Sequence, residues 1–201
     1  MNNKKTLALI SLALVLLIGG ASVLYARLGQ SLSMDQLAVQ QPQQQMETAD
    51  TGKTAAKEST DPEQVLAPDF TVYDKDGNDV QLSDYAGKPI VLNFWASWCG
   101  PCQMEMPDFH EKYLELGQDV HFLMVNMTDG SRETVESASS FINKNAYAFP
   151  VFYDTAVDAA MTYGVYSLPT TYFINAKGHA IAQATGSINA ETLQRGIDMI
   201  L

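Results

Sequence analysis

The chain of 201 residues has few cysteines, few histidines and few basic side chains. Its two cysteines, Cys99 and Cys102, cannot build a small secreted scaffold held by several disulfides. Only 12 Lys and Arg stand against 23 Asp and Glu, which gives a formal charge of −11. Phosphate backbones are held by clustered Lys and Arg, so a nucleic acid is a poor candidate for a partner.

The composition also lacks the strong bias of a disordered chain or a polytopic membrane protein. Hydrophobic residues make up 46% and the mean hydropathy is −0.08, close to neutral. The length is long for one ordinary domain and short for two. We therefore expect one folded domain with additional segments.

An uncharged, apolar run covers residues 6–26 and follows Lys4 and Lys5. As a helix with a rise of about 1.5 Å per residue, it would span roughly 30 Å, the thickness of a bilayer core. The alternative is a cleaved signal peptide, which prefers a shorter apolar stretch and small residues at the cleavage site. We expect residues 1–27 to form a single transmembrane anchor, with the two lysines inside and the bulk of the chain outside the cytoplasm.

Residues 28–64 are rich in Gln, Thr, Ala and Ser and contain no aromatic residue. Such a segment buries too little apolar surface to offset its ordering entropy, so it is expected to be a flexible linker. A short amphipathic helix around residues 34–45 is the alternative.

Residues 65–201 alternate turn signals with apolar runs of two periods, which predicts a folded α/β domain. The expected strands are a hairpin at 70–73 and 80–82, buried strands at 89–95, 120–127 and 149–153, and a second hairpin at 170–175 and 180–184. The expected helices are 101–116 with Gly117 as its C-cap, 131–145, 155–163, and a closing helix capped by Asn189. Together they predict a three-layer sandwich on a mixed central β-sheet, with an N-terminal β-hairpin.

The two cysteines form a Cys-Gly-Pro-Cys motif between an expected buried strand and the following helix. The unpaired N–H groups and the dipole at the start of a helix stabilise a thiolate, so the pKa of Cys99, at the exposed first position, is expected to be lowered. Cys102 lies one turn further on, placed to attack a mixed disulfide at Cys99. Gly100 and Pro101 keep the intervening turn tight.

Two other roles of a cysteine pair have less support from the sequence. A structural zinc ion needs four ligands, and the three histidines supply none in a usual spacing. A static disulfide across so short a loop adds little stability. Redox chemistry at Cys99 and Cys102 is therefore favoured, with the disulfide itself in place of a cofactor and no metal.

The wider pattern resembles the thioredoxin superfamily, and more narrowly the membrane-anchored TlpA/ResA-like extracytoplasmic thiol-disulfide oxidoreductases. The resemblance covers nearly all of residues 65–201. The residues that carry it are 67–70 (APDF), 82–85 (LSDY), 93–102 (NFWASWCGPC), Pro107, Phe149-Pro150 and 168–175 (LPTTYFIN), with an inserted helix and strand before Phe149.

The resemblance assigns roles to several of these residues. Pro169 would be a cis-proline facing the disulfide, and the backbone of Leu168 would pair with an extended substrate segment. The alternative for Pro169 is a turn proline. Pro107 would kink the motif helix. Trp98, Gly100 and Pro101 would flank the substrate, while Trp95 would pack beneath the site. Both tryptophans could equally be ordinary core residues, which is the favoured interpretation for Trp95.

One departure from cytoplasmic thioredoxin concerns proton transfer. Thioredoxin has a buried Asp six residues before its first cysteine, where this chain has Asn93. Glu105 lies three residues after Cys102 and so on the same helical face. The resemblance implies a glutamate near the cysteine pair; if it is partly buried, its pKa rises and it can accept the proton of Cys102. The alternative is a solvated helix carboxylate.

The Gly-Pro dipeptide resembles the reducing end of the superfamily, so we expect a protein-disulfide reductase outside the cytoplasm. The resemblance implies a membrane thiol carrier of the CcdA/DsbD type as electron donor, and protein disulfides, apocytochrome c among them, as substrates. The alternatives are a copper chaperone, which typically has a CxxxC pair and a distant His, a thiol oxidase or isomerase of secreted proteins, and a binding module with an inert disulfide.

Overall fold

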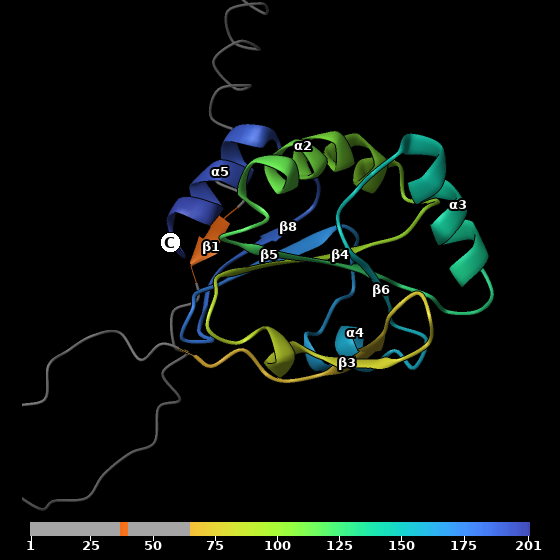
Figure 1. Cartoon of the computed structure of the whole chain (residues 1–201), viewed down its shortest axis with the longest axis horizontal. Helices are drawn as coiled ribbons and strands as arrows, with labels where there is room; N and C mark the ends of the chain where they lie inside the picture. The colour runs from red at the N-terminus through yellow and green to blue at the C-terminus, as the bar shows by residue number, and fades with distance from the viewer. Residues whose placement is uncertain (1–36, 40–64) are drawn as a thin grey trace, which may run out of the picture. The chain divides into compact units, whose positions relative to one another are not determined.

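The computed structural model describes residues 37–39 and 65–201, which form an α/β sandwich (Figure 1). The strands are β1 (Leu37–Val39), β2 (Thr71–Tyr73), β3 (Asp79–Gln81), β4 (Ile90–Trp95), β5 (His121–Asn126), β6 (Val151–Tyr153), β7 (Thr170–Ile174) and β8 (Ala180–Thr185). The helices are the 3-10 helix η1 (Leu82–Tyr85), α2 (Gly100–Leu116), α3 (Val135–Asn145), α4 (Asp158–Thr162) and α5 (Ala190–Asp198).

All eight strands belong to one mixed sheet in the order β1-β8-β7-β4-β5-β6-β2-β3. β4 pairs in parallel with β5 and antiparallel with β7, and β5 pairs in parallel with β6. Every residue of β4 is buried, as expected of a central strand that is covered on both faces. The strand that leads to the cysteine motif therefore lies at the centre of the fold.

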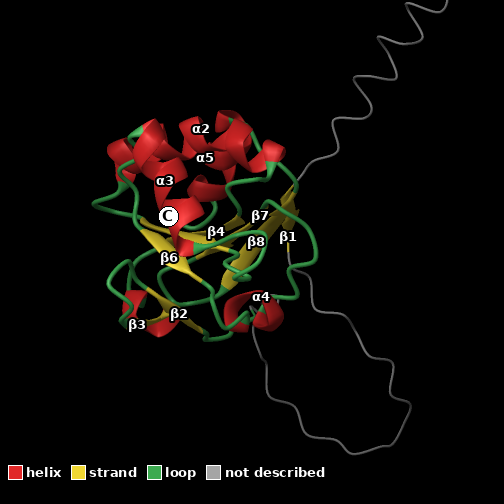
Figure 2. Cartoon of the chain, turned by 90° about the vertical axis from the view of Figure 1, so that its right-hand side faces the viewer, coloured by secondary structure: helices red, strands yellow, loops and turns green. Residues whose placement is uncertain are grey.

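Helices cover both faces of the sheet (Figures 1 and 2). α2, α3 and α5 lie on one face, and α4 and η1 lie on the other face, next to the β2–β3 hairpin that forms one edge of the sheet. The expected three-layer sandwich is thus confirmed, as is the N-terminal hairpin, whose turn contains Gly77 at φ +82°. β5 and α3 occupy the stretch between α2 and Phe149.

The motif helix α2 follows its sequence signals at both ends. Cys99 is the N-cap, Pro101 lies in the first turn, and Gly117 is the C-cap. Pro107 lies inside the helix. Its buried residues recur at helical spacing and face the sheet: Cys102, Glu105, Met106 and Phe109.

Three elements begin more than one residue later than predicted: β6 at Val151, α4 at Asp158 and, with the largest difference, α3 at Val135 instead of residue 131. The Oδ1 atom of Asp129 accepts the backbone N–H groups of Ser131, Arg132 and Glu133, at 2.8, 2.8 and 3.0 Å. An aspartate that bonds the backbone ahead of it competes with helix formation. Residues 129–133 therefore form a loop, and Thr134 caps the helix instead.

Part of the expected linker forms structure. Leu37–Val39 pairs antiparallel with β8 as an edge strand, where the sequence predicted a tether or a short helix. The rest of residues 28–64, and the expected anchor at 1–27, lie outside the described residues. Among the helices that are described, none is long and apolar enough to cross a membrane.

α5 packs very closely on the sheet at a glycine. A Cβ atom added at Gly196 would overlap the ring of Phe173 in β7. Phe173, Leu193 and Ile197 are fully buried around this contact. The close approach of helix and strand therefore depends on the missing side chain.

Candidate active site

The cysteine motif lies where β4 passes into α2. The turn is closed by the Cys99 N–H, which donates to the carbonyl of Ala96 at 3.1 Å. Cys99 and Cys102 form a disulfide, and the N–H of Cys102 lies 3.2 Å from the Cys99 sulfur. The sequence predicted an exposed Cys99, but it is only 4% exposed, against 0% for Cys102, because the surrounding segments enclose it. Cys99 remains the more accessible of the two.

A cavity of about 460 Å³ opens beside Cys99. Five of the residues that the sequence singled out line it: Trp98, Cys99, Gly100, Pro101 and Leu168. Residues that the sequence did not single out complete the wall: Met127, Asp129, Arg132, Asp154, Val157, Val165, Tyr166 and Ser167. The disulfide therefore borders a space that is mostly apolar and carries charged groups of both signs.

The peptide bond between Leu168 and Pro169 is cis, as the resemblance implied. Pro169 is buried, and its carbonyl accepts the N–H of Gly186 at 2.8 Å. The bond directly precedes β7, which pairs with β4. This pairing brings Leu168 to the cavity that also contains Cys99.

Glu105 is buried at 1% exposure, three residues after Cys102 on the buried face of α2. Its Oε1 atom accepts from Asn93 Nδ2 at 2.9 Å, and its Oε2 atom accepts the N–H of Ile188 at 3.0 Å. Burial raises the pKa of Glu105 to about 7 from an ordinary value of 4.5, although both hydrogen bonds lower it. A solvated helix carboxylate is thus excluded, and the group can exchange a proton near neutral pH.

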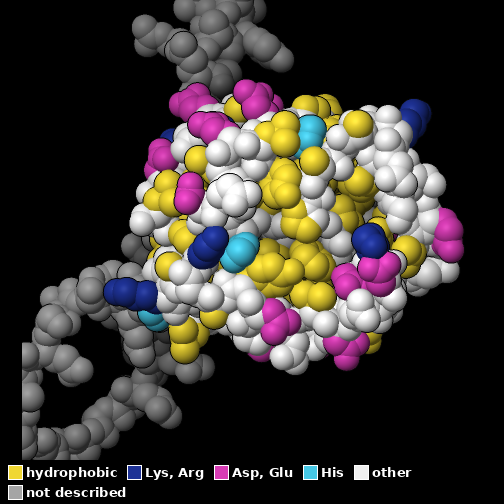
Figure 3. All heavy atoms as spheres, in the orientation of Figure 1, with side chains coloured by type: hydrophobic (Ala, Val, Ile, Leu, Met, Phe, Trp, Pro, Cys, Tyr) yellow, Lys and Arg dark blue, Asp and Glu magenta, His cyan; other side chains and the backbone are white. Residues whose placement is uncertain are grey.

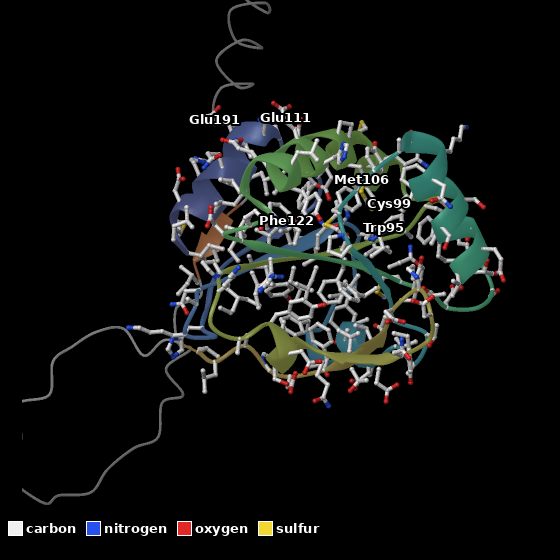
Figure 4. All side chains as sticks on the ribbon, in the orientation of Figure 1. Trp95, Cys99, Met106, Glu111, Phe122 and Glu191 are labelled. Atoms are coloured by element: carbon white, nitrogen blue, oxygen red, sulfur yellow. A yellow bond between two sulfur atoms is a disulfide. The ribbon has the colours of Figure 1, made fainter. Side chains whose placement is uncertain are left out.

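The two tryptophans have different surroundings. Trp95 is fully buried and belongs to the same core cluster as Cys99 and Met106, between the sheet and α2 (Figure 4), whereas Glu111 and Glu191 lie on the outer side of the helices. Trp98 is 40% exposed, and the guanidinium carbon of Arg132 lies 3.5 Å from the centre of its ring. Trp98 therefore forms a wall of the cavity with a cation stacked on it.

Sequence reasoning missed Arg132 and Glu133. Glu133 accepts two hydrogen bonds from Ser97, in the turn before Cys99. The available signal was their position just after β5, which is adjacent and parallel to β4, since the carboxyl ends of parallel strands lie at the same edge of a sheet.

Acidic side chains are spread around the visible surface (Figure 3). Within the described residues, no three His, Cys, Asp or Glu side chains are grouped so that they could hold a metal ion.

Residues 64–182 match the AhpC/TSA family. The thiol-disulfide oxidoreductase ResA of Bacillus thuringiensis subsp. konkukian is 35% identical over 137 residues, which cover 67% of this chain and 76% of that protein. ResA of Bacillus subtilis is 32% identical over 150 residues, 74% and 79% of the two chains. The crystal structure of a putative thiol:disulfide interchange protein DsbE from Chlorobium tepidum matches with a TM-score of 0.59 and 30% identity, over 67% of this chain and 94% of that one. The chain therefore belongs to the AhpC/TSA family of thioredoxin-like proteins, and within it to the ResA-like thiol-disulfide oxidoreductases.

Proposed function

We propose that the protein is an extracytoplasmic disulfide reductase that cycles between the Cys99–Cys102 disulfide and the dithiol. The observation that carries the proposal is the Cys99–Cys102 disulfide at the start of α2, beside a cavity and on the same helix as a buried carboxylate, Glu105. A helix N-terminus stabilises the thiolate of its first cysteine, which is the reactive form.

The reaction begins with the reduced pair. The Cys99 thiolate attacks one sulfur of a substrate disulfide, forms a mixed disulfide and releases the other substrate sulfur as a thiolate, which takes up a proton. Cys102 then loses its proton and attacks the Cys99 sulfur. The Cys99–Cys102 disulfide forms, and the second substrate thiol leaves. Two electrons pass from the protein to the substrate.

Glu105 is proposed to take the proton of Cys102. The two residues are separated by three positions on α2 and both face the core. A general base is most effective when its pKa lies near the working pH, and the pKa of Glu105 is raised to about 7 by burial. Since Glu105 carries that proton only transiently, it returns the proton to the departing substrate thiolate or to solvent.

The substrate is proposed to be an extended protein segment that contains a disulfide. Its backbone would lie along Leu168 and Pro169, and its side chains would contact Trp98, Gly100 and Pro101 around the cavity. Apocytochrome c before haem attachment is the proposed physiological substrate. The support is the similarity to ResA proteins and the open, mainly apolar cavity beside Cys99.

The reductase needs electrons from outside the chain, because each turnover leaves it oxidised. We propose a membrane thiol carrier of the CcdA/DsbD type as the donor, and a single-pass anchor at residues 1–27 that keeps the catalytic domain on the extracytoplasmic side. The apolar run at 6–26 behind two lysines supports this placement.

Trapping of the mixed disulfide tests the proposal. Full-length Cys102→Ser, purified in detergent and reduced, is expected to form a stable covalent adduct with a disulfide-containing apocytochrome peptide, through Cys99. The matched Cys99→Ser variant is expected to form none. An adduct through Cys102, or turnover that persists in Cys99→Ser, would contradict the assigned roles. Reduced wild-type protein that fails to cleave the peptide would contradict the reductase itself.

A further inference from the structure

A second buried carboxylate, Glu133, lies beside the active-site turn and takes no part in the steps above. It is completely buried and belongs to the loop between β5 and α3. β4 and β5 run in parallel, with Trp95 opposite Asn126, so both strands end at the same edge of the sheet. This topology brings the loop next to the turn 96–99, which carries Cys99.

The two oxygens of Glu133 serve different sides of the loop. Oε2 accepts from the N–H of Ser97 at 3.0 Å and from its hydroxyl at 2.9 Å. Oε1 accepts from the hydroxyl of Ser137 at 3.1 Å and from Asn126 Nδ2 at 3.4 Å. These donors compensate the carboxylate for its loss of water. Oε2 therefore binds the active-site turn, and Oε1 binds α3 and β5.

Ser97 is fixed at each of its polar groups. Its N–H and hydroxyl bind Glu133, and its carbonyl accepts from the side-chain amide of Gln103 in α2. Ser97 lies inside the turn that the Cys99 N–H closes on Ala96. A rotation of the peptide at Ser97 would therefore move Cys99, two residues further along.

A second contact joins the loop and the turn, between Arg132, which precedes Glu133, and Trp98, which follows Ser97. Arg132 stacks on Trp98, while Glu133 binds Ser97. Asp129 fixes the loop itself through the backbone N–H groups of Arg132 and Glu133. Both central residues of the turn are thus held by consecutive residues of an ordered loop.

We propose that Glu133 is a positioning residue for thiol-disulfide exchange: through Ser97 it orients the turn so that the Cys99 sulfur faces the cavity. This inference rests on the proposed role of Cys99 as nucleophile. Glu133 acts through hydrogen bonds to Ser97 and does not contact the reacting sulfur. Displacement of a reacting group by about 1 Å can slow a reaction about a hundredfold, so a small shift of the turn is expected to reduce the rate.

The test uses the reduced full-length chain. It compares a substitution of Glu133 with substitutions of Ser97, which bonds its Oε2 atom, and of Ser137, which bonds its Oε1 atom. The rate constants of Cys99 alkylation by iodoacetamide and of attack on a model peptide disulfide are measured, together with the denaturation midpoint. Glu133→Gln and Ser97→Ala are expected to slow both reactions by about tenfold. The control Ser137→Ala loses its bonds to Glu133 and to the Thr134 N–H, so it lowers the midpoint but keeps both rates.

The outcomes separate the possibilities. If Glu133→Gln and Ser97→Ala lower only the midpoint and react at the wild-type rates, Glu133 is a purely structural group and the inference is overturned. If Glu133→Gln does not fold, Ser97→Ala decides, because it removes the hydroxyl bond and keeps the N–H bond. Failure of the reduced wild-type chain to react at Cys99 would overturn the proposed function as well, whereas a normal wild-type rate with unaffected variants overturns this inference alone.

Discussion

Asn93 in β4 donates a hydrogen bond of 2.9 Å to Glu105 in α2, and both side chains are buried in the core. Asn93 Nδ2 also lies 3.0 Å from the hydroxyl of Thr171 in β7. The amide thus connects the Glu105 carboxylate of α2 with the strand that follows the cis-proline. An amide at this position donates to a carboxylate but cannot take over its proton at neutral pH, so the proposed proton transfer is assigned to Glu105 and not to Asn93.

Removal of the Glu105 carboxylate is expected to slow resolution of the mixed disulfide. In Glu105→Gln, Cys102 has no neighbouring base, and the loss of general-base catalysis is expected to reduce the rate by about a hundredfold at pH near 7. Stopped-flow measurement of the release of substrate thiol reports this step. The variant is expected to remain folded, because glutamine has nearly the same shape. A rate equal to that of the wild type across the whole pH range would remove Glu105 from the mechanism.

Asn93→Leu is expected to move the pH dependence of that step upward. The hydrogen bond from Asn93 lowers the pKa of Glu105, so its loss raises that pKa further above about 7. The midpoint of the pH–rate profile shows the change. Thr171→Val is the matched control, because it removes the other neighbour of Asn93 and keeps the bond to Glu105. Equal midpoints in Asn93→Leu and the wild type would contradict this coupling.

The same carboxyl group makes stability depend on pH. The pKa of Glu105 is higher in the folded protein, about 7, than its ordinary value of 4.5, so folding favours the protonated form. Its contribution is fully present below pH 4.5 and is lost as the pH rises through about 7, a change of about 3 kcal/mol. Denaturant titrations of the wild type and Glu105→Gln at about pH 4 and about pH 8 measure it. Between the lower and the higher pH, the free energy of unfolding is expected to fall by about 3 kcal/mol more in the wild type than in Glu105→Gln. The same pH dependence in both proteins would disprove the assignment.

Gly196→Ala is expected to destabilise the fold. The added methyl group would overlap the ring of Phe173, so α5 must move away from the sheet, at a cost of about 1–3 kcal/mol. Chemical denaturation measures the loss. Gly100→Ala serves as the stability control, since a Cβ atom there meets nothing within 4 Å. Equal stability of the two variants would show that the contact between α5 and β7 can accommodate an added methyl group.

Local patterns in the sequence predicted most of the described fold. The continuous apolar run of β4, the Asp-Gly turn of the first hairpin, and the caps at Gly117 and Asn189 are each encoded within a few neighbouring residues, and the structure has them at these positions. The burial of Glu105 was an open alternative, because helical spacing places the carboxylate on one face but does not show what covers that face.

The contacts that the sequence did not reveal join distant segments. The bonds from Ser97 to Glu133 and the stacking of Arg132 on Trp98 exist because β4 and β5 end side by side. The late start of α3 depends on one aspartate, Asp129, whose bonds to the following backbone compete with a helix that the apolar spacing favoured. β1 pairs with β8 although its surroundings in the sequence are typical of a linker.

The reduction potential of the Cys99–Cys102 pair distinguishes a disulfide reductase from an oxidant of thiols. The full-length protein in detergent is equilibrated in glutathione or dithiothreitol buffers, and tryptophan fluorescence follows the redox state, because Trp98 adjoins Cys99 and Trp95 lies in the same core cluster as both cysteines. We expect a potential below about −230 mV, near that of thioredoxin, as a reductase with an external electron donor requires. A potential near about −120 mV would identify an oxidant of folding proteins and would contradict the proposed direction of electron flow.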